Sequence, residues 1–213
     1  MINSNSVKWL IAALFVGVFL LSGAGAEVLA GQEPPDDCRL ISLDDLIGRE
    51  SPRFESFPAA STPGLRPAAV NWNSHPLARR FRTAIRNAVA AGPNFAGHFT
   101  LIGWGCGSSC LEWALVDART GRVHFPPREI ATVSTVHVET ASEESRVPFN
   151  GLRFRPDSRL LILLGAPAED DSREGILFYH WSGKTFKKVR AYRIQRPWSA
   201  CLEDEAATPK IPQ

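Results

Sequence analysis

The sequence predicts an α+β protein, mainly an antiparallel β-meander of about eight strands with one amphipathic helix packed on it and disulfide bonds for support. Three observations lead to this fold class. Short stretches rich in valine, threonine and aromatic residues recur at near-regular spacing after residue 94, with turn residues between them. Only residues 74–91 repeat apolar side chains with a helical period. The four cysteines are an even number, which favours disulfides in an exported chain.

The N-terminus predicts export. Lys8 precedes an apolar run of 13 residues from Trp9 to Leu21, and small residues follow as far as Ala30. This pattern is typical of a secretory signal peptide, here residues 1–30 with cleavage after Ala26 or Ala30. The run is shorter than the roughly 20 residues of a membrane span, and an uncleaved anchor is the alternative. We expect a periplasmic or secreted protein that meets the membrane only through the signal peptide.

The mature chain, about 185 residues, is long enough for one domain with its own core. We expect an N-terminal extended segment with a short helix over 31–73, a globular core over 74–201 and a flexible tail over 202–213. Charge is nearly balanced, with 24 basic and 22 acidic residues and no long run of one sign. Nucleic-acid binding is therefore not expected.

The segment before the core contains one short helix and a long connection. Ser42, with Asp45 three residues later, forms a variant of the capping box, and Gly48 ends the helix. Residues 51–73 are rich in proline and alanine without a period, which indicates an extended connection. Its anchors to the body of the protein are expected to be Phe54, Phe57 and Trp72.

The predicted helix begins with Ser74 as its cap and Pro76 in its first turn, and Gly92-Pro93 ends it. Its apolar stripe consists of Leu77, Phe81, Ala84, Ile85, Ala88 and Val89. Arg79, Arg80, Arg82 and Arg86 cover much of the remaining surface. A basic face of this kind can bind an acidic partner or phospholipid head groups, but a solvated face is the favoured interpretation.

The remaining chain reads as strands joined mostly by hairpins. Thr120-Gly121, Pro156-Asp157-Ser158 and Ser182-Gly183-Lys184 supply turn residues. The expected strands are 95–104, 111–118, 122–125, 130–140, 152–155, 160–164, 176–181 and 185–194.

The cysteines predict two disulfides that contribute unequally to stability. Cys106 and Cys110 can meet across a hairpin tip, which leaves Cys38 and Cys201 to join the two ends of the domain. In the chain-entropy model the small loop contributes about 2 kcal/mol and the large one about 5 kcal/mol. The short bridge is therefore expected to shape its loop more than to stabilise the fold.

The candidate recognition loop comprises the residues around this short bridge, namely Trp104, Gly105, Gly107, Ser108, Ser109 and Trp113. Thiol redox catalysis favours two intervening residues at the start of a helix, whereas three residues separate these cysteines and both flanks read as strands. A phosphate loop and a nucleophile elbow both need a following helix. Histidines and cysteines are too scattered for a metal site. No cofactor is expected. Core packing is the favoured role for at least one of the two tryptophans.

One polar constellation is a weaker candidate for catalysis. If paired residue numbers in the hairpin sum to 215, His98 lies opposite Asp117; if they sum to 216, Cys106 faces Cys110 and His98 moves away from Asp117. The disulfide favours the second register. In either register about 20 Å separates His98 from Ser108 and Ser109, so these residues do not form a triad.

The same region resembles a group of uncharacterised exported bacterial proteins in which helix, strand and loop run in this order. The resemblance covers roughly residues 77–125 and brings no known activity with it. The motifs that carry it are Phe81-Arg82-Thr83, Gly92-Pro93-Asn94-Phe95-Ala96-Gly97-His98, Trp104-Gly105-Cys106-Gly107 with Cys110, and Asp117 with Thr120-Gly121.

A looser resemblance links the strand, the five-residue disulfide loop and the following strand to the inhibitory hairpin of the Ivy-type periplasmic lysozyme inhibitors. Those proteins insert such a loop into the lysozyme cleft. Their loop presents a histidine and an acid, whereas this loop offers only Gly107, Ser108 and Ser109.

Three functions follow as hypotheses, in this order. The first is a binding module that presents the clasped loop to a protein or to a cell-envelope glycan. The second is an inhibitor of an exogenous hydrolase such as lysozyme. The third is an enzyme that uses His98 with Glu112 or Asp117. An exposed tip beside an aromatic patch favours the first two, and a pocket that holds His98 within hydrogen-bond reach of a carboxylate favours the third.

Overall fold

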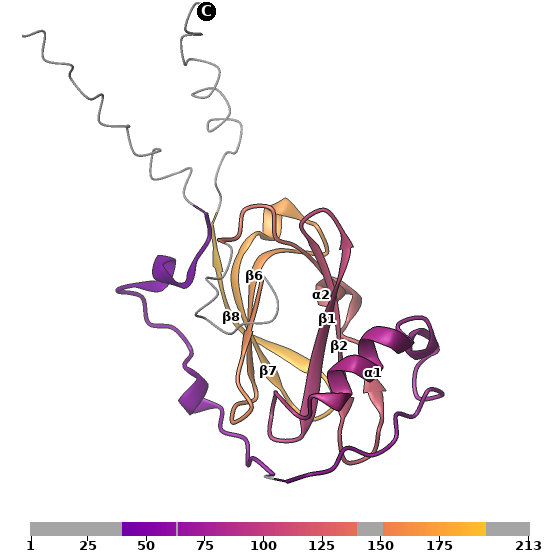
Figure 1. The fold of residues 1–213 in the computed structure, drawn as a ribbon. Helices are drawn as coiled ribbons and strands as arrows, with labels where there is room; N and C mark the ends of the chain where they lie inside the picture. Colours follow the sequence, from indigo (N-terminus) through magenta and orange to yellow (C-terminus); the bar gives the residue numbers. More distant parts are fainter. Residues whose placement is uncertain (1–39, 63, 140–150, 195–213) are drawn as a thin grey trace, which may run out of the picture. The chain divides into compact units, whose positions relative to one another are not determined.

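A computed structural model describes residues 40–62, 64–139 and 151–194, all of which belong to one structural unit, residues 34–213 (Figure 1). The predicted signal peptide, the Cys38–Cys201 pair and the tail 202–213 lie outside these described residues. Across the described ranges, no helix combines the length and the apolar character that a membrane crossing requires.

The fold is built on one antiparallel sheet of eight strands, which confirms the predicted fold class. The strand order is β1-β2-β4-β6-β7-β8, while β3 pairs with β2 and β5 pairs with β6. The strands are β1 Phe99–Gly107, β2 Cys110–Asp117, β3 Val123–His124, β4 Thr132–Ser134, β5 Leu152–Phe154, β6 Leu160–Pro167, β7 Gly175–Trp181 and β8 Phe186–Arg193.

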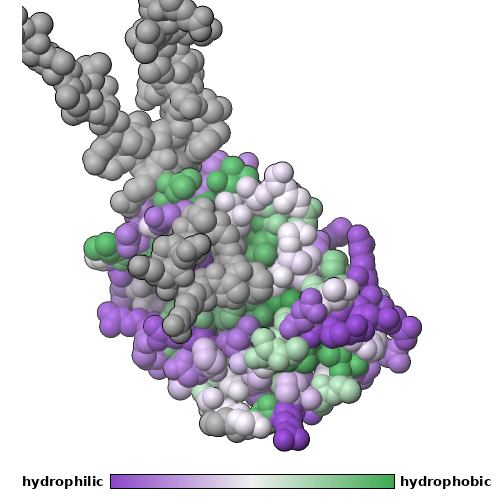
Figure 2. Space-filling view, viewed as in Figure 1, coloured by the Kyte–Doolittle hydropathy of each residue, from purple (hydrophilic) through white to green (hydrophobic). Residues whose placement is uncertain are grey.

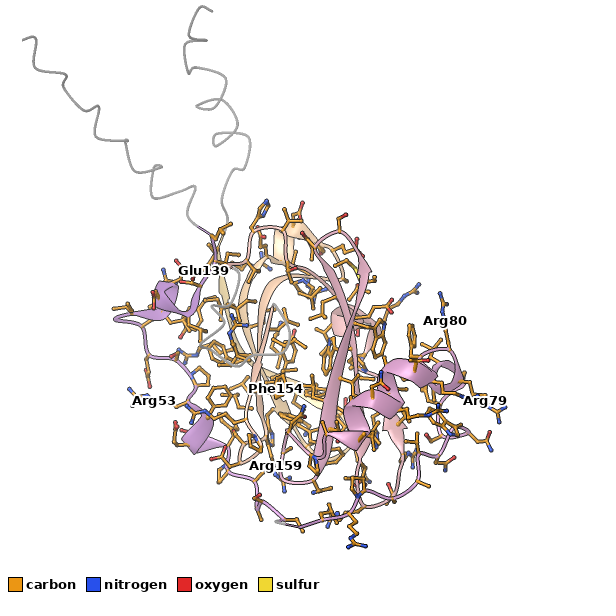
Figure 3. The ribbon with its side chains drawn as sticks, in the orientation of Figure 1. Arg53, Arg79, Arg80, Glu139, Phe154 and Arg159 are labelled. Carbon is orange, nitrogen blue, oxygen red and sulfur yellow. A yellow bond between two sulfur atoms is a disulfide. The ribbon has the colours of Figure 1, made fainter. Side chains whose placement is uncertain are left out.

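The sheet coils so that β1 and β2 face β6, β7 and β8 across a shared core (Figure 1). Leu101 and Trp113 from the first half pack in one cluster with Leu177 and Phe186 from the second. Phe154 points into the space between the halves in Figure 3, and its ring meets Phe95 edge-on at 6.2 Å. Strand twist accumulated over several strands brings the two halves face to face.

Two further apolar clusters cover the outer faces of the sheet. Alternation along β1 and β2 places Ile102 and Val116 on the outer face, where they pack against Ile85 of helix α1, Arg82–Ala90. The outer face of β6 and β7 is covered by Ile41 and the aromatic residues of the N-terminal segment. Phe54 and Phe57 pack there and Trp72 packs beside α1, so the three predicted anchors are confirmed.

The predicted helix over 74–91 is divided in two, which corrects the single-helix expectation. A 3₁₀ turn, η4 (Pro76–Arg79), precedes α1, and Phe81 between them leaves helical dihedrals at φ −101° and ψ 24°. Ser74 does not cap the helix, because its hydroxyl accepts the Val123 amide of β3 at 2.9 Å. His75 takes that place, and its side chain accepts the first amide of η4.

The short N-terminal helix is confirmed as η2, Leu43–Leu46, with both hydrogen bonds of the capping box between Ser42 and Asp45 in place. It is a 3₁₀ rather than an α-helical turn. Two more 3₁₀ turns are η3 (Phe54–Ser56) and η6 (Asp171–Arg173).

The strand expected at 95–104 begins only at Phe99. Ala96 and Gly97 adopt positive φ angles of 46° and 84°, so the chain turns before β1. A Cβ at position 97 would collide with the carbonyl oxygen of Ala60, which explains why glycine occupies this position.

The strand expected at 130–140 is also wrong over most of its length. Its first residues belong to a helical turn, α2 (Arg128–Ala131), and only Thr132–Ser134 form β4. The turn buries Ile130, whose carbonyl accepts the indole N–H of Trp113 at 2.7 Å. Tertiary packing therefore overrides the β propensity of the valine- and threonine-rich stretch.

Candidate functional site

The exposed tip of the β1–β2 hairpin is closed by the predicted Cys106–Cys110 disulfide, with 5.2 Å between the Cα atoms. From Phe99 to Gly105 the numbers of the paired residues sum to 216, which is the register that the disulfide favours. The register then shifts, so that Gly107 rather than Cys106 pairs with Cys110. The expectation that the two cysteines face each other directly is therefore wrong, because a bulge at Cys106 accommodates the closing turn.

The tip is held from one side by Thr135. Ser109 adopts a left-handed conformation at φ 50°, which turns its carbonyl toward the sheet. That carbonyl accepts the Thr135 backbone N–H at 2.7 Å and the Thr135 hydroxyl at 3.1 Å. Ser108 and Ser109 are themselves exposed. The tip therefore combines an exposed surface with a constrained backbone.

The β6–β7 turn lies beside the tip and is strained in the same way. Ala168 and Glu169 at its centre have φ angles of 56° and 57°, and the Asp170 amide closes the turn onto Pro167. Two-residue turns with two left-handed residues normally use asparagine and glycine. Glu169 instead brings a carboxylate oxygen to 3.8 Å from the Cys110 sulfur.

Among the described residues, three of the four non-glycine residues with positive φ gather at this end of the sheet: Ser109, Ala168 and Glu169. Such a residue costs about 1 kcal/mol or more and persists only where the surroundings enforce it. We use the term tip surface for Gly105–Ser109 together with Glu169. The tip surface therefore combines strained backbone residues with a disulfide bond.

The two tryptophans of the candidate loop have different environments. Trp113 is 1% exposed in the core, so it contributes nothing to the surface. Trp104 is half-buried: its ring stacks on Phe81 at 4.2 Å, and its N–H donates to a Glu112 carboxylate oxygen at 2.8 Å. Phe125 meets it edge-on. Trp104 therefore links β1 to β2 beneath the tip through its hydrogen bond to Glu112. It also forms a partly exposed aromatic cluster with Phe81 and Phe125.

The weaker polar candidate lies at the opposite end of β1. His98 Nε2 is 3.8 Å from Asp117 Oδ1, so the expectation that the 216 register separates them is wrong. Asp117 is the last residue of β2 and pairs with Phe99, the residue after His98, so the two side chains lie at the same end of the hairpin. Asp117 is already occupied, because it accepts the Arg119 amide at 2.9 Å and the Thr120 hydroxyl at 3.0 Å.

Arg119 is the residue of this cluster that the sequence did not single out. Its guanidinium donates to His98 Nε2 at 2.8 Å, which requires that nitrogen to be unprotonated. Burial, and next to it the charge of Arg119, lower the pKa of His98, although Asp117 acts in the opposite direction. A neutral imidazole whose nitrogen already accepts a guanidinium is poorly placed to act as a general base.

The structure does not assemble the proposed catalytic groups. Glu112 is engaged with Trp104 near the tip, far along the hairpin from His98. His98 lines neither of two pockets among the described residues, one between residues 50–57 and the outer side of β8, the other beside Tyr179. Among the described residues, no group of three potential metal ligands is present.

The basic helix face is solvated in part and engaged with aromatic rings in part. Arg79 and Arg80 project away from the sheet in Figure 3, and hydrophilic side chains gather over this side in Figure 2. The Arg80 guanidinium also lies 5.6 Å from the Phe81 ring, and that of Arg82 lies 5.6 Å from the Trp72 ring. Phe81 belongs to the aromatic cluster around Trp104, and Trp72 packs on the same outer apolar cluster.

Comparison of the chain with protein-family models, with curated proteins and with solved structures finds no match.

Proposed function

We propose that this chain is a periplasmic or secreted binding protein that presents the tip surface to a protein partner. The observation that carries the proposal is the convergence of the Cys106–Cys110 disulfide with Ser109, Ala168 and Glu169, all strained, at one exposed end of the sheet. A fold retains such strain where a particular surface shape is needed. The disulfide also supports an oxidising compartment, because such bonds are rare in the cytosol.

A protein partner is favoured over a cell-envelope glycan. Sugar recognition by tryptophan depends on an open ring face, and a free N–H can add a hydrogen bond. Trp104 has one face against Phe81, and its N–H is bonded to Glu112, while Trp113 is buried. The tip itself offers backbone groups, two serine hydroxyls and the Glu169 carboxylate, which suit a polar protein surface.

Inhibition of a hydrolase is a narrower form of the same proposal. It requires the tip to enter a cleft, and the disulfide together with the Thr135 hydrogen bonds would hold it in one shape for insertion. The enzyme hypothesis has less support, since the Nε2 atom of His98 accepts a hydrogen bond from Arg119 and His98 lines neither of the two pockets described above.

The test compares the full chain with Ser108→Arg, which adds a large cation to the exposed tip without changing the backbone. Ser61→Arg is the matched control: Ser61 is also exposed, and its neighbour Ala60 lies against Gly97 at the other end of the sheet. Each immobilised protein is exposed to periplasmic and secreted fractions and to peptidoglycan fragments.

We expect a specific protein to be retained by the wild type and by Ser61→Arg and lost with Ser108→Arg. Retention of the same protein by all three variants would contradict the proposal. Binding of peptidoglycan fragments that depends on Ser108 would support the glycan instead.

A further inference from the structure

A β-bulge in strand β8 changes the face of the sheet on which the side chains of this strand lie. Tyr179 of β7 pairs with Lys188, but the preceding residue Phe178 pairs with Arg190 rather than Val189. Val189 is therefore the extra residue on β8. A bulge of this kind redirects the side chains that follow it, and bulges are common beside functional sites.

The bulge decides where Lys188 lies. Directly paired residues share a face, so Lys188 is on the interior face with Tyr179, just as Phe186 is with Trp181. Beyond the bulge, Tyr192 packs on the outer face. Without the bulge, Lys188 and Tyr192 would lie on the same face. Lys188 is exposed, so its side chain lies on the solvent side of the apolar residues of this face.

Lys188 lines a pocket of about 300 Å³ that opens beside the main core. Ile130, Tyr179 and Phe186 form an apolar lining, and all three are almost fully buried members of that core. The volume is at the lower end of the range for small-molecule sites, roughly 300–1,000 Å³. The pocket is therefore suited to a ligand with one small ring or a short branched body.

Polar groups gather at the rim of the same pocket. Arg173 and Lys188 supply two cations against one carboxylate, that of Glu129. One Arg173 nitrogen donates to the Glu129 backbone carbonyl at 3.2 Å, and the guanidinium also hydrogen-bonds to the Tyr179 side chain. These two bonds fix the guanidinium at the rim, and its remaining N–H groups can donate to a ligand. Burial raises the pKa of Tyr179, although the nearby Arg173 lowers it, so the hydroxyl keeps its proton and can donate.

We propose that this pocket binds a small organic anion, a carboxylate on an apolar body. Ile130 and Phe186 contact the body of the ligand, and the carboxylate lies between Lys188 and Arg173 with the Tyr179 hydroxyl as a further donor. Two N–H-bearing cations and a hydroxyl match the lone pairs of a carboxylate. The site uses none of the tip-surface residues, so it is independent of the proposed tip function.

The test is a titration of the full chain with benzoate, followed by the backbone amide NMR signals of Ile130, Tyr179 and Phe186. Benzamide is the neutral isostere, and inorganic phosphate is an anion without an apolar body. Lys188→Gln removes the cation on the interior face. Lys187→Gln is the matched control, because the adjacent lysine lies on the other face and does not line this pocket.

We expect benzoate to shift these three amides in a saturable way. Benzamide and the Lys188→Gln protein should each bind at least tenfold more weakly, which is the effect of one hydrogen bond to a charged group. Phosphate should also bind at least tenfold more weakly, because it has no apolar body to contact Ile130 and Phe186. Lys187→Gln should bind benzoate as the wild type does. No saturable shift, equal binding of benzamide, or an equal loss in Lys187→Gln would each overturn the proposal.

Discussion

Thr135 holds the carbonyl oxygen of Ser109 with two hydrogen bonds, one from its backbone N–H and one from its hydroxyl. This relationship ties the hairpin tip to a residue 26 positions later in the chain. It keeps Ser109 in its left-handed conformation, and with it the shape of the clasped loop. The tip is therefore supported from outside the hairpin as well as by its disulfide.

Replacement of Thr135 by valine removes the hydroxyl bond and keeps both the shape and the backbone bond. We expect a loss of about 1 kcal/mol in the free energy of unfolding, or roughly 2–4 °C in Tm. Faster hydrogen exchange at Ser108 and Ser109 should accompany it. Thr132→Val is the control, because the hydroxyl of this β4 residue bonds to no group among the described residues. Equal effects of the two variants would show that Thr135 does not support the tip.

Replacement of Ala168-Glu169 by Asn-Gly relieves two left-handed residues. We expect stability to rise by about 1–2 kcal/mol, measured by urea unfolding, since these residue types adopt positive φ at little cost. If the strain serves recognition, partner binding at the tip should fall in the same variant. Gly183→Ala is the reciprocal control: Gly183 has φ 90° and open space around it, so alanine should destabilise the protein by conformation alone. A variant that gains no stability would contradict the strain argument.

Removal of the short disulfide by Cys106→Ser with Cys110→Ser should lower Tm only slightly. The closed loop is small, and its entropic contribution is about 2 kcal/mol. Loss of the pair Cys38 and Cys201 should cost more, about 5 kcal/mol, if those residues are joined. Thermal melts of the two double variants compare the effects directly. Equal losses would show that the pairing or the assigned roles are wrong.

Acidification should destabilise the fold through its histidines. Burial lowers the pKa of His98, His124 and His180 below the ordinary value of 6.5. As pH falls through 6.5 the unfolded chain binds protons first, so stability is lost until the pH reaches the lowered folded pKa. His98→Gln should remove part of this loss. Urea midpoints at pH 7.5 and pH 5 measure it, and a midpoint that rises on acidification because of His98 would contradict the assignment.

The sequence predicted the features of the fold that depend on local pattern. Alternation identified the long strands, the three- and four-residue repeat located α1, and the spacing of Cys106 and Cys110 led to the clasp. The requirement that Cys106 and Cys110 meet also favoured the correct register over most of the hairpin. A slip of one residue would move every side chain to the other face.

The misses share one cause, which is competition from partners distant in the chain. Ser74 bonds to Val123 rather than capping a helix, and Ile130 enters a helical turn because the core and Trp113 require it there. The sequence did not indicate a role for Arg119, because that role depends on its hydrogen bond to His98, which lies 21 residues earlier in the chain. Propensity and periodicity describe neighbours within a few residues, and these contacts lie beyond that range.

By itself, therefore, the sequence determined the antiparallel sheet, its packed helix and a hairpin tip closed by two cysteines, since each depends on the order of nearby residues. Only the tertiary structure decided that three strained residues meet at that tip and that a bulge at Val189 places Lys188 at the rim of a pocket beside the core. The physical reason is that strain and side-chain direction are set by what packs against a segment. The coiling of the sheet chooses those neighbours, and a local pattern does not.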